Sequence, residues 1–496
     1  MQEFDLLVIG AGPAGYVGAI RAAQLGARVC LVEKAEVGGV CMNRGCIPTK
    51  SLVAFAELYE KTQSSAAFGV RVEGQVTADL AAAVRRKREV VATLVKGVRS
   101  LLVKRGVTLV SGEASFVNER TVEVAGARTT VGGAGADAHA VASADRFSAK
   151  KILVATGSEA AELPGLPFDG SRVMSSTEAL ELEAVPRSLL IVGAGAIGCE
   201  FAFVFSALGA CVTVVEIMDR ALPAEDRDIS AVMERELRKR KIDLVTEDSV
   251  VSCAVNPASV RSTLRSGSEL DTERVLVSVG RRFNTAGLLL DRAGVRCGPK
   301  GEILADEHME TSSAGVYAAG DVVGKKMYAH SASREAIVAI ENALADGFAG
   351  NDASEAGRLR EGTAAGRRTM DYSAVPACTF TRPEVGSVGL TEAQALELGL
   401  KVKVGSFNFR ALGRAQVLGE IAGMVKVVAD ADTDVVLGLH VIGPHATELV
   451  HEGVLAVSQR LTARALSETI HAHPTLSEAV MEAAEGVRGL SIHSPA

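Results

Sequence analysis

Two cysteines at close spacing are the residues of this chain best suited to chemistry. Cys41 and Cys46 lie inside the glycine-rich stretch from Gly38 to Lys50. On a regular α-helix, five residues advance about 7.5 Å, which is roughly beyond the 7 Å limit between the Cα atoms of a disulfide. A bridge between these cysteines therefore needs an irregular turn, which glycine and Asn43 favour.

The residues after the second cysteine predict a helix. Pro48 suits the first turn of a helix, so Cys46 is expected at the positive helix end, where a thiolate is stabilised and made reactive. We interpret the pair as a redox-active dithiol. The alternatives are two buried structural cysteines or half of a metal site, and no second cysteine pair with ligand spacing supports the latter. The other cysteines are most simply small core residues: Cys30, Cys199, Cys211, Cys253, Cys297 and Cys378.

Length and composition indicate a large α/β enzyme. The chain has 496 residues, 48% apolar content, 50 glycines and no Trp, and it is long enough for three or four domains. Its net charge of −7 argues against nucleic-acid or anionic-membrane binding as a main function. The first expected strand, residues 4–9, leaves no room for a targeting peptide, and no apolar run is long enough to span a bilayer. Sparse cysteine usage suggests a reducing compartment.

An internal repeat predicts two dinucleotide-binding units. Residues 6–15 recur as residues 189–198, and the register holds through a helix to a second apolar strand that ends in Glu33 or Glu216. Each copy has the strand, turn and helix that the G-x-G-x-x-G motif requires. The glycines let the backbone approach a pyrophosphate, and each glutamate would accept a ribose hydroxyl hydrogen bond. The motif glycines are Gly10, Gly12 and Gly15, and Gly193, Gly195 and Gly198.

The acidic residue of the second copy also bears on the choice of nicotinamide cofactor. The carboxylate of Glu216 would repel a 2′-phosphate, and no Arg follows immediately to bind one. NAD is therefore favoured over NADP, although Arg220 lies close by.

Three further segments are expected to be strands that stop at glycine. They span residues 151–157, 274–282 and 316–321, and the last of them ends in Asp321, which could bind a ribityl or phosphate group. Ordinary strand-end turns would explain them equally well. Residues 137–147 and 345–369 resemble surface insertions.

A histidine near the C-terminus is a candidate base. His473 precedes Pro474, and Glu478 lies five residues further on, where it could fold back to orient the ring and raise its basicity. His471 would face the same side of an extended stretch, but a metal pair lacks a third ligand. A surface histidine with no catalytic role is at least as consistent with the sequence.

Together these residues resemble the flavin-dependent pyridine nucleotide-disulfide oxidoreductases, most closely the dihydrolipoamide dehydrogenases among them. The resemblance covers nearly the whole chain. The matching motifs are residues 38–50, 318–321, 381–385, 388–392 and 471–478. It implies an α/β fold with two Rossmann-like domains, for FAD and NAD, and a C-terminal α+β dimerisation domain. The implied boundaries are 1–158 and 283–350 for the FAD-binding and central parts, 159–282 for the NAD-binding domain, 351–371 for a linker and 372–496 for dimerisation.

The resemblance also implies a reaction and partners. His473, oriented by Glu478, would deprotonate dihydrolipoamide bound at the active site of the partner subunit. The dihydrolipoamide thiolate would then attack Cys41 at that active site. Cys46 would then face FAD as a thiolate, and hydride would leave for NAD. The expected partners are a second copy of the chain and a lipoyl-bearing protein of a 2-oxoacid, acetoin or glycine-cleavage system, in the cytoplasm or, after loss of a presequence, the mitochondrial matrix. Neither nucleic acid nor membrane is expected as a partner.

Cofactor contacts follow residue by residue from the same resemblance. Lys50, paired with Glu200, would lie near the flavin ring. The remaining expected contacts, besides the motif glycines, Glu33, Glu216 and Asp321, are Ala114, Thr156, Gly157, Ser158, Gly280, Gly320, Met327, Ala329 and His330.

Some positions depart from the family pattern, and two other functions compete. Val40 and Arg44 replace the more usual Thr and Val, and Tyr328 and Ser331 replace Leu and Lys. One competing function is an NAD(P)H-dependent reductase of another disulfide. The other is an inactive structural subunit of a multienzyme complex, which would require the loss of a reactive residue.

Overall fold

The computed structural model describes residues 2–130, 139–140, 145–345 and 366–493. The chain forms two compact units. The first comprises residues 1–48, 87–160 and 280–372, and the second comprises residues 49–86, 161–279 and 373–496. The expected insertions at 137–147 and 345–369 lie largely outside the described residues, and the expected domain boundaries stay a prediction.

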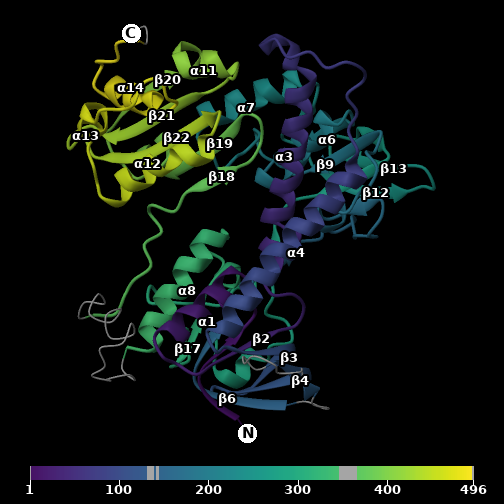
Figure 1. The fold of residues 1–496 in the computed structure, drawn as a ribbon, viewed down its shortest axis with the longest axis vertical. Coiled ribbons are helices and arrows are strands. Elements are labelled where there is room, and N and C mark those ends of the chain that lie inside the picture. Colours follow the sequence, from purple (N-terminus) through teal and green to yellow (C-terminus); the bar gives the residue numbers. More distant parts are fainter. Residues whose placement is uncertain (1, 131–138, 141–144, 346–365, 494–496) are drawn as a thin grey trace. The chain divides into compact units, whose positions relative to one another are not determined.

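The first unit is built on a seven-stranded sheet in the order β17-β6-β1-β2-β3-β4-β5 (Figure 1). The strands from β17 to β3 pair in parallel, and β4 pairs antiparallel to β3. The strands of this sheet are β1 (Gln2–Ile9), β2 (Val29–Glu33), β3 (Thr108–Asn118), β4 (Thr121–Thr130), β5 (His139–Ala140), β6 (Asp145–Val154) and β17 (Val316–Ala318). Strands β7 (Ser158–Ala160) and β16 (Arg281–Phe283) form a separate antiparallel pair. The helices are α1 (Pro13–Gln24), α2 (Gly39–Arg44), η2 (Leu290–Ala293), η3 (Asp321–Val323) and α8 (Ala329–Ala343).

Helices α1 and α8 lie side by side in the first unit (Figure 1). Gly18 lets α1 approach β6 closely, because a Cβ there would lie 2.8 Å from the Leu153 side chain, whereas Ala336 and Ile340 on α8 would lie at an ordinary contact distance of 3.5 Å. Strand β2 and, from Phe4 on, strand β1 are almost continuously buried, and so are residues 152–154 of β6, as expected for parallel strands covered on both faces.

Two long helices, α3 (Cys46–Gln63) and α4 (Leu80–Lys104), pass between the units along the chain. The part of α3 that belongs to the second unit is packed by Leu52, Val53 and Ala56, which join the core around α6. None of the helices in the described residues is both long and apolar enough to cross a membrane.

The second unit contains three sheets. Five parallel strands run in the order β11-β10-β9-β15-β8, three form the antiparallel sheet β12-β13-β14, and five form the C-terminal antiparallel sheet β18-β19-β22-β21-β20. The first two sheets comprise β8 (Val173–Met174), β9 (Ser188–Val192), β10 (Cys211–Val215), β11 (Asp243–Val245), β12 (Val250–Val255), β13 (Val260–Leu264), β14 (Glu269–Thr272) and β15 (Arg274–Val277). The third comprises β18 (Ala377–Thr379), β19 (Glu384–Gly389), β20 (Val402–Asn408), β21 (Met424–Asp430) and β22 (Val436–Gly443).

Helices cover these sheets, and α12 and α14 pack against the C-terminal one (Figure 1). The helices of the second unit, besides its part of α3 and α4, are η1 (Ser65–Phe68), α5 (Ser176–Ala179), α6 (Ala196–Ala207), α7 (Arg227–Lys239), α10 (Glu392–Glu397), η4 (Phe409–Ala411), α11 (Gly413–Leu418), α12 (Ala446–Ser458), α13 (Ala463–Glu468) and α14 (Glu478–Val487). The expected α/β class with two Rossmann-like repeats is therefore present, and so is the expected C-terminal α+β domain.

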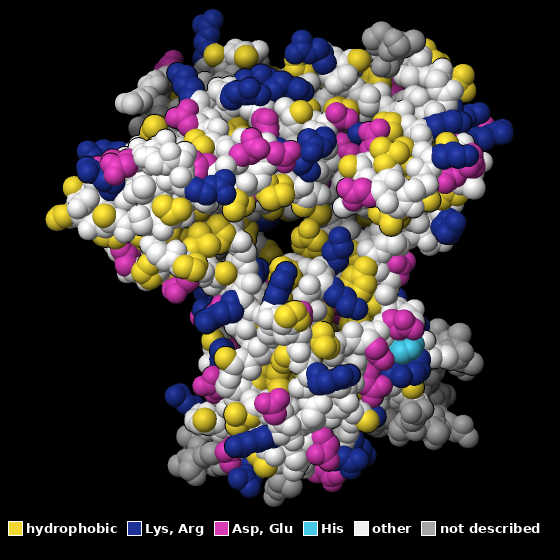
Figure 2. Space-filling view, turned by 180° about the vertical axis from the view of Figure 1, so that it is seen from behind, with side chains coloured by type: hydrophobic (Ala, Val, Ile, Leu, Met, Phe, Trp, Pro, Cys, Tyr) yellow, Lys and Arg dark blue, Asp and Glu magenta, His cyan; other side chains and the backbone are white. Residues whose placement is uncertain are grey.

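The surface carries both signs of charge. On the face drawn in Figure 2, basic and acidic side chains are interspersed, in keeping with the modest net charge of −7.

A buried lysine joins the nucleotide-binding part of the second unit to its C-terminal sheet. Lys426 on β21 is 2% exposed, and its Nζ lies 2.9 Å from Asp226, 2.6 Å from Asp228 and 2.8 Å from Glu392. Burial opposes the charge of Lys426, but its three carboxylate partners raise its pKa above the ordinary value. Asp226 also caps α7 through the amide of Asp228.

We expect Lys426→Met to lower the free energy of unfolding by about 3–5 kcal/mol, because it leaves the buried carboxylate of Asp226 without a compensating positive charge. Urea unfolding followed by circular dichroism measures the change. Lys401→Met is the matched control, since the Lys401–Asp432 pair is 78% and 70% exposed, and such pairs contribute about 0–1 kcal/mol. Equal stability losses in the two variants would contradict the assignment.

Candidate active site

The helical structure is interrupted between the two cysteines. Helix α2 contains Cys41 and ends at Arg44, Gly45 has φ −142° and ψ −108°, and α3 begins at Cys46. The side-chain amide of Asn43 donates to the carbonyls of Val37 and Gly39 at 3.1 and 2.9 Å, which holds the turn. The irregular turn that the sequence predicted is therefore present.

Cys46 lies at the N-terminus of α3, as expected, with Pro48 in the first turn. The partial positive charge of that helix end favours a thiolate. Burial, and after it the negative charge of Cys41 and Cys46, raises the pKa of the Tyr16 hydroxyl on α1. Tyr16 was not among the site residues predicted from the sequence, because it is not part of the G-x-G-x-x-G motif.

The first glycine motif forms a tight cradle at the start of α1. Gly10 has φ +99°, and a Cβ on Gly15 would lie only 1.7 Å from the Gly10 carbonyl oxygen. Gly12 caps the helix, and the nearest atom to a Cβ there, Gly39 Cα, is 4.0 Å away. Glu33 accepts hydrogen bonds from the amides of Ala11 (2.6 Å) and Ala35 (2.8 Å). A carboxylate has about four acceptor sites, so Glu33 can still accept a ribose hydroxyl.

Polar groups gather beside this cradle in the first unit. The hydroxyl oxygen of Thr156 is buried and has no hydrogen-bond partner among the described residues. Ser158 donates to Asp321, and Arg281 contacts Ser158 at 2.6 Å and Asp321 at 3.4 Å. An unsatisfied buried hydroxyl next to a glycine turn and a helix N-terminus fits a pyrophosphate-bearing cofactor such as FAD.

The second motif repeats this geometry in the second unit. Gly193 has φ +102°, Gly195 caps α6, and a Cβ on Gly198 would lie 1.9 Å from the Gly193 carbonyl oxygen. Glu216 is 6% exposed and accepts from the amides of Ala194 (2.6 Å) and Met218 (2.9 Å). The glycine turn, the helix N-terminus and the carboxylate at the strand end therefore fit a dinucleotide in the second cradle as well.

The nearby arginine of the second cradle is already engaged. Arg220 contacts Asp219 and the carbonyl of Pro223, each at 2.8 Å. This arrangement favours NAD, because a 2′-phosphate would meet the Glu216 carboxylate while the Arg220 guanidinium is held elsewhere.

Lys50 and Glu200 form the ion pair that the sequence predicted. Lys50 Nζ lies 2.9 Å from both carboxylate oxygens of Glu200 and 4.5 Å from the centroid of the Phe380 ring. The amide of Phe380 also donates to Glu200 at 2.9 Å. Burial raises the pKa of Glu200, and Lys50 and the Phe380 amide only partly offset that effect.

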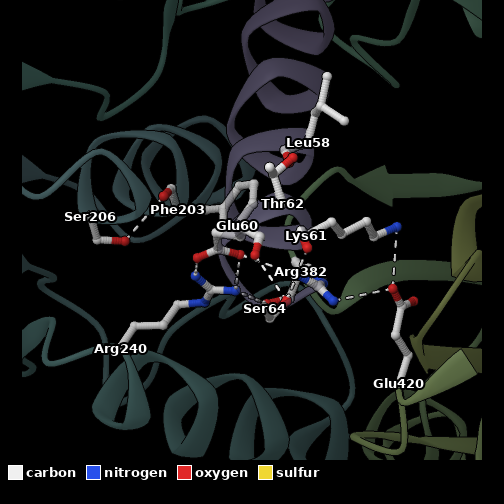
Figure 3. Close-up of polar contacts among 10 residues, drawn as sticks. All are labelled: Leu58, Glu60, Lys61, Thr62, Ser64, Phe203, Ser206, Arg240, Arg382 and Glu420. Atoms are coloured by element: carbon white, nitrogen blue, oxygen red, sulfur yellow. Dashed lines mark hydrogen bonds and ion pairs between the residues drawn. The ribbon is translucent and has the colours of Figure 1, made fainter. Parts of the chain in front are cut away.

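The C-terminal end of α3 is anchored by a network of charges (Figure 3). Glu60 accepts two hydrogen bonds from Arg240, at 2.5 and 3.2 Å, and contacts Arg382 at 3.4 Å. Arg382 and Lys61 both reach Glu420 at 3.2 Å. The network ties α3 to the end of α7 and to two loops of the C-terminal sheet, and so fixes the helix that carries Lys50.

His473 and Glu478 are brought together in the second unit. The His473 Nδ1 lies 2.8 Å from Glu478 Oε1, while Glu478 Oε2 accepts from the amide of Thr475 at 2.8 Å. Burial opposes the charge of Glu478, but these two hydrogen bonds hold its pKa below the ordinary value. The His473 side chain is 77% exposed. Nδ1–H donating to Glu478 would leave Nε2 available as a base.

The neighbouring histidine has a carboxylate of its own. The His471 side chain is 6% exposed, and its Nε2 lies 2.7 Å from Glu452. Among the described residues, no group of three or more His, Cys, Asp or Glu could hold a metal ion.

The remaining expected contacts all belong to the first unit. Gly157, Gly280 and Gly320 adopt positive φ values of +68°, +142° and +83° at strand ends. Ala114 is a core residue of β3, Ala329 begins α8, Met327 is 40% exposed, and the His330 ring stacks on Tyr328 at 5.3 Å between centroids. Sequence reasoning missed Arg281 and the amide of Phe380. The only signal for Arg281 was its position directly after Gly280.

Comparison with protein families gives two matches that together cover most of the chain. Residues 4–336 match "Pyridine nucleotide-disulphide oxidoreductase", and residues 375–484 match its "dimerisation domain". His473 and Glu478 both lie in the second match.

Similar proteins extend over the full length. The chain is 40% identical to a dihydrolipoyl dehydrogenase of Thermus scotoductus, with 99% of each chain covered. It is 39% identical to one of Chlamydia pneumoniae, with 100% of this chain and 99% of the relative covered. Among solved structures, LpdA from Mycobacterium tuberculosis has a TM-score of 0.84 at 26% identity, covering 98% of this chain and 99% of that one. The HOCl-induced flavoprotein disulfide reductase RclA from Escherichia coli has a TM-score of 0.79 at 26% identity, covering 97% and 99%.

These findings confirm the resemblance, the fold class and the expectation of FAD and NAD as cofactors. With its paired dinucleotide cradles, its cysteine pair and its C-terminal domain all matched, the chain belongs to the pyridine nucleotide-disulphide oxidoreductase family.

Proposed function

We propose that this chain is an enzyme that oxidises protein-bound dihydrolipoamide to lipoamide and reduces NAD⁺ to NADH. The observation that carries the proposal is the helix break at Gly45, which separates Cys41 from Cys46 and sets Cys46 at the start of α3. Relatives that match over the full length support this substrate.

The two cysteines carry the first half of the reaction. A dihydrolipoyl thiolate attacks Sγ of Cys41, the Cys41–Cys46 bond breaks, and Cys46 leaves as a thiolate. The second dihydrolipoyl thiolate then displaces Cys41, so that the lipoamide disulfide forms and both cysteines are reduced. FAD supplies the two-electron relay between the reduced cysteines and NAD⁺. Two electrons and one proton leave on NADH, and one proton is released.

Two side chains and one helix end support this chemistry. His473, held through Nδ1 by Glu478, takes the dihydrolipoyl proton at Nε2. The positive end of α3 stabilises the Cys46 thiolate. Lys50, paired with Glu200, would supply a positive charge near the flavin ring.

We infer that the working form is a homodimer in which His473 serves the cysteines of the partner subunit. Its exposed ring and its position within the dimerisation match support this arrangement. A lipoyl-bearing protein of a 2-oxoacid, acetoin or glycine-cleavage system would supply the substrate, in the cytoplasm.

Sharing of the active site between subunits is tested with two inactive variants. We expect Cys46→Ser and His473→Ala to be nearly inactive alone in dihydrolipoamide-dependent NAD⁺ reduction. When they are co-expressed with random pairing, about half of the dimers are mixed and each has one intact site, so about a quarter of wild-type activity should return.

A matched control uses the same lesions in one chain. Co-expression of wild type with Cys46→Ser/His473→Ala should also give about a quarter of full activity, because each mixed dimer then has no intact site. If both residues acted within one chain, co-expression of the two single variants would give about zero activity. Co-expression of wild type with the double variant would then give about half of full activity. That pattern would overturn the shared site.

Cofactor preference provides a second test. The wild-type kcat/KM should favour NAD⁺ over NADP⁺ by at least about tenfold, because the buried Glu216 carboxylate repels the 2′-phosphate. The Glu216→Gln variant keeps an oxygen that can accept the Ala194 amide, and it should lower the kcat/KM preference for NAD⁺ over NADP⁺. Glu33→Gln is the matched control, since it makes the same change in the first cradle and should leave the ratio unaltered. Equal wild-type efficiency with both cofactors would refute the assignment.

A further inference from the structure

A buried carboxylate lies directly behind the turn that carries Asp321. Glu335 on α8 is 0% exposed, and its Oε2 accepts the amide of Gly320 at 2.6 Å. Its Oε1 accepts from the hydroxyls of Tyr372 at 2.9 Å and Ser331 at 3.2 Å. One side chain therefore links the turn, helix α8 and the last residue of the first unit.

The Gly320 turn is closely packed against the first cradle. Gly320 has φ +83°, and a Cβ there would lie 3.2 Å from Ala14 on α1 and 3.4 Å from Ala332 on α8. The next residue, Asp321, accepts from Ser158 and faces Arg281. A shift of the Gly320 amide would therefore move Asp321 relative to the cradle.

The surroundings of Glu335 make its charge dependent on these donors. In the described part of the chain, the three donors to Glu335 are all uncharged. Burial raises the pKa of Glu335, the Gly320, Tyr372 and Ser331 hydrogen bonds oppose that rise, and the negative charge of Asp321 on η3 adds to it. A cation lies next to one of these donors, since Lys325 Nζ is 5.1 Å from the centroid of the Tyr372 ring.

We propose that Glu335 and Tyr372 are positioning residues for FAD: the Tyr372 hydroxyl favours the ionised form of Glu335, which holds the Gly320 amide and thereby aims Asp321 at the cofactor. The inference rests on the proposed function, in that it takes the first cradle to be the FAD site. A protonated Glu335 would give up part of its acceptor capacity and release the turn.

The test measures FAD binding to apoprotein by flavin fluorescence between about pH 5 and 8. Tyr372→Phe removes one hydroxyl and should raise the dissociation constant for FAD about tenfold near neutral pH, the usual effect of losing a hydrogen bond to a charged group. Loss of affinity on acidification should begin at a higher pH than in wild type, because the carboxylate has lost a donor that favours its charged form. Glu335→Gln should make the affinity nearly independent of pH over this range.

Two controls separate positioning from general destabilisation. Tyr317→Phe makes the same deletion on neighbouring β17, where the hydroxyl interacts with Arg367, and should leave the pH profile unchanged. If Tyr372→Phe does not fold, Ser331→Ala removes the other hydroxyl from Oε1 and should shift the profile in the same direction by less. A wild-type pH profile in the folded Tyr372→Phe or Ser331→Ala protein would overturn the inference. Failure of wild-type apoprotein to bind FAD would instead overturn the proposed function.

Discussion

The break in the backbone at Gly45 is the constraint on which the rest of the site depends. One continuous helix through both cysteines would hold their Cα atoms too far apart for a disulfide. The break lets α3 begin at Cys46, and the same helix carries Lys50 one turn later and ends in the network around Glu60. The helix end that stabilises a thiolate, the Lys50 cation and the anchoring network therefore belong to one helix.

The two nucleotide cradles share the same hydrogen bond between a glycine turn and a glutamate. In each, a glutamate at the end of the second strand accepts the amide that follows the first glycine, at 2.6 Å in both copies. This hydrogen bond fixes the glycine turn before any ligand arrives, which reduces the ordering that cofactor binding must supply. We expect the same carboxylate to contribute to cofactor selectivity in the second cradle, because its charge is compatible with ribose hydroxyls and unfavourable to a 2′-phosphate. On this proposal, the shape of the turn and the choice of cofactor depend on the same side chain.

Local patterns in the sequence predicted much of the site, and long-range contacts supplied the rest. The glycine cradles, the start of α3 at Cys46 and the His473–Glu478 pair each depend on residues a few positions apart, so spacing alone indicated them. Arg281 meets Ser158 across 123 positions and the Phe380 amide meets Glu200 across 180, and no local periodicity encodes such pairs. The buried Glu335 was missed because two of its three donors, Gly320 and Tyr372, lie 15 and 37 positions away along the chain.

We propose above all that the Cys41–Cys46 pair transfers electrons between a dihydrolipoyl substrate and FAD. The most direct test is an anaerobic titration of the FAD-loaded protein with dihydrolipoamide, followed by its visible absorption spectrum. The first two electrons should enter the cysteines and leave FAD oxidised, with a new long-wavelength absorption band from the Cys46 thiolate. In Cys46→Ser this band should be absent. Direct bleaching of FAD in the wild-type protein, with no such band and at the same rate in Cys46→Ser, would contradict the account.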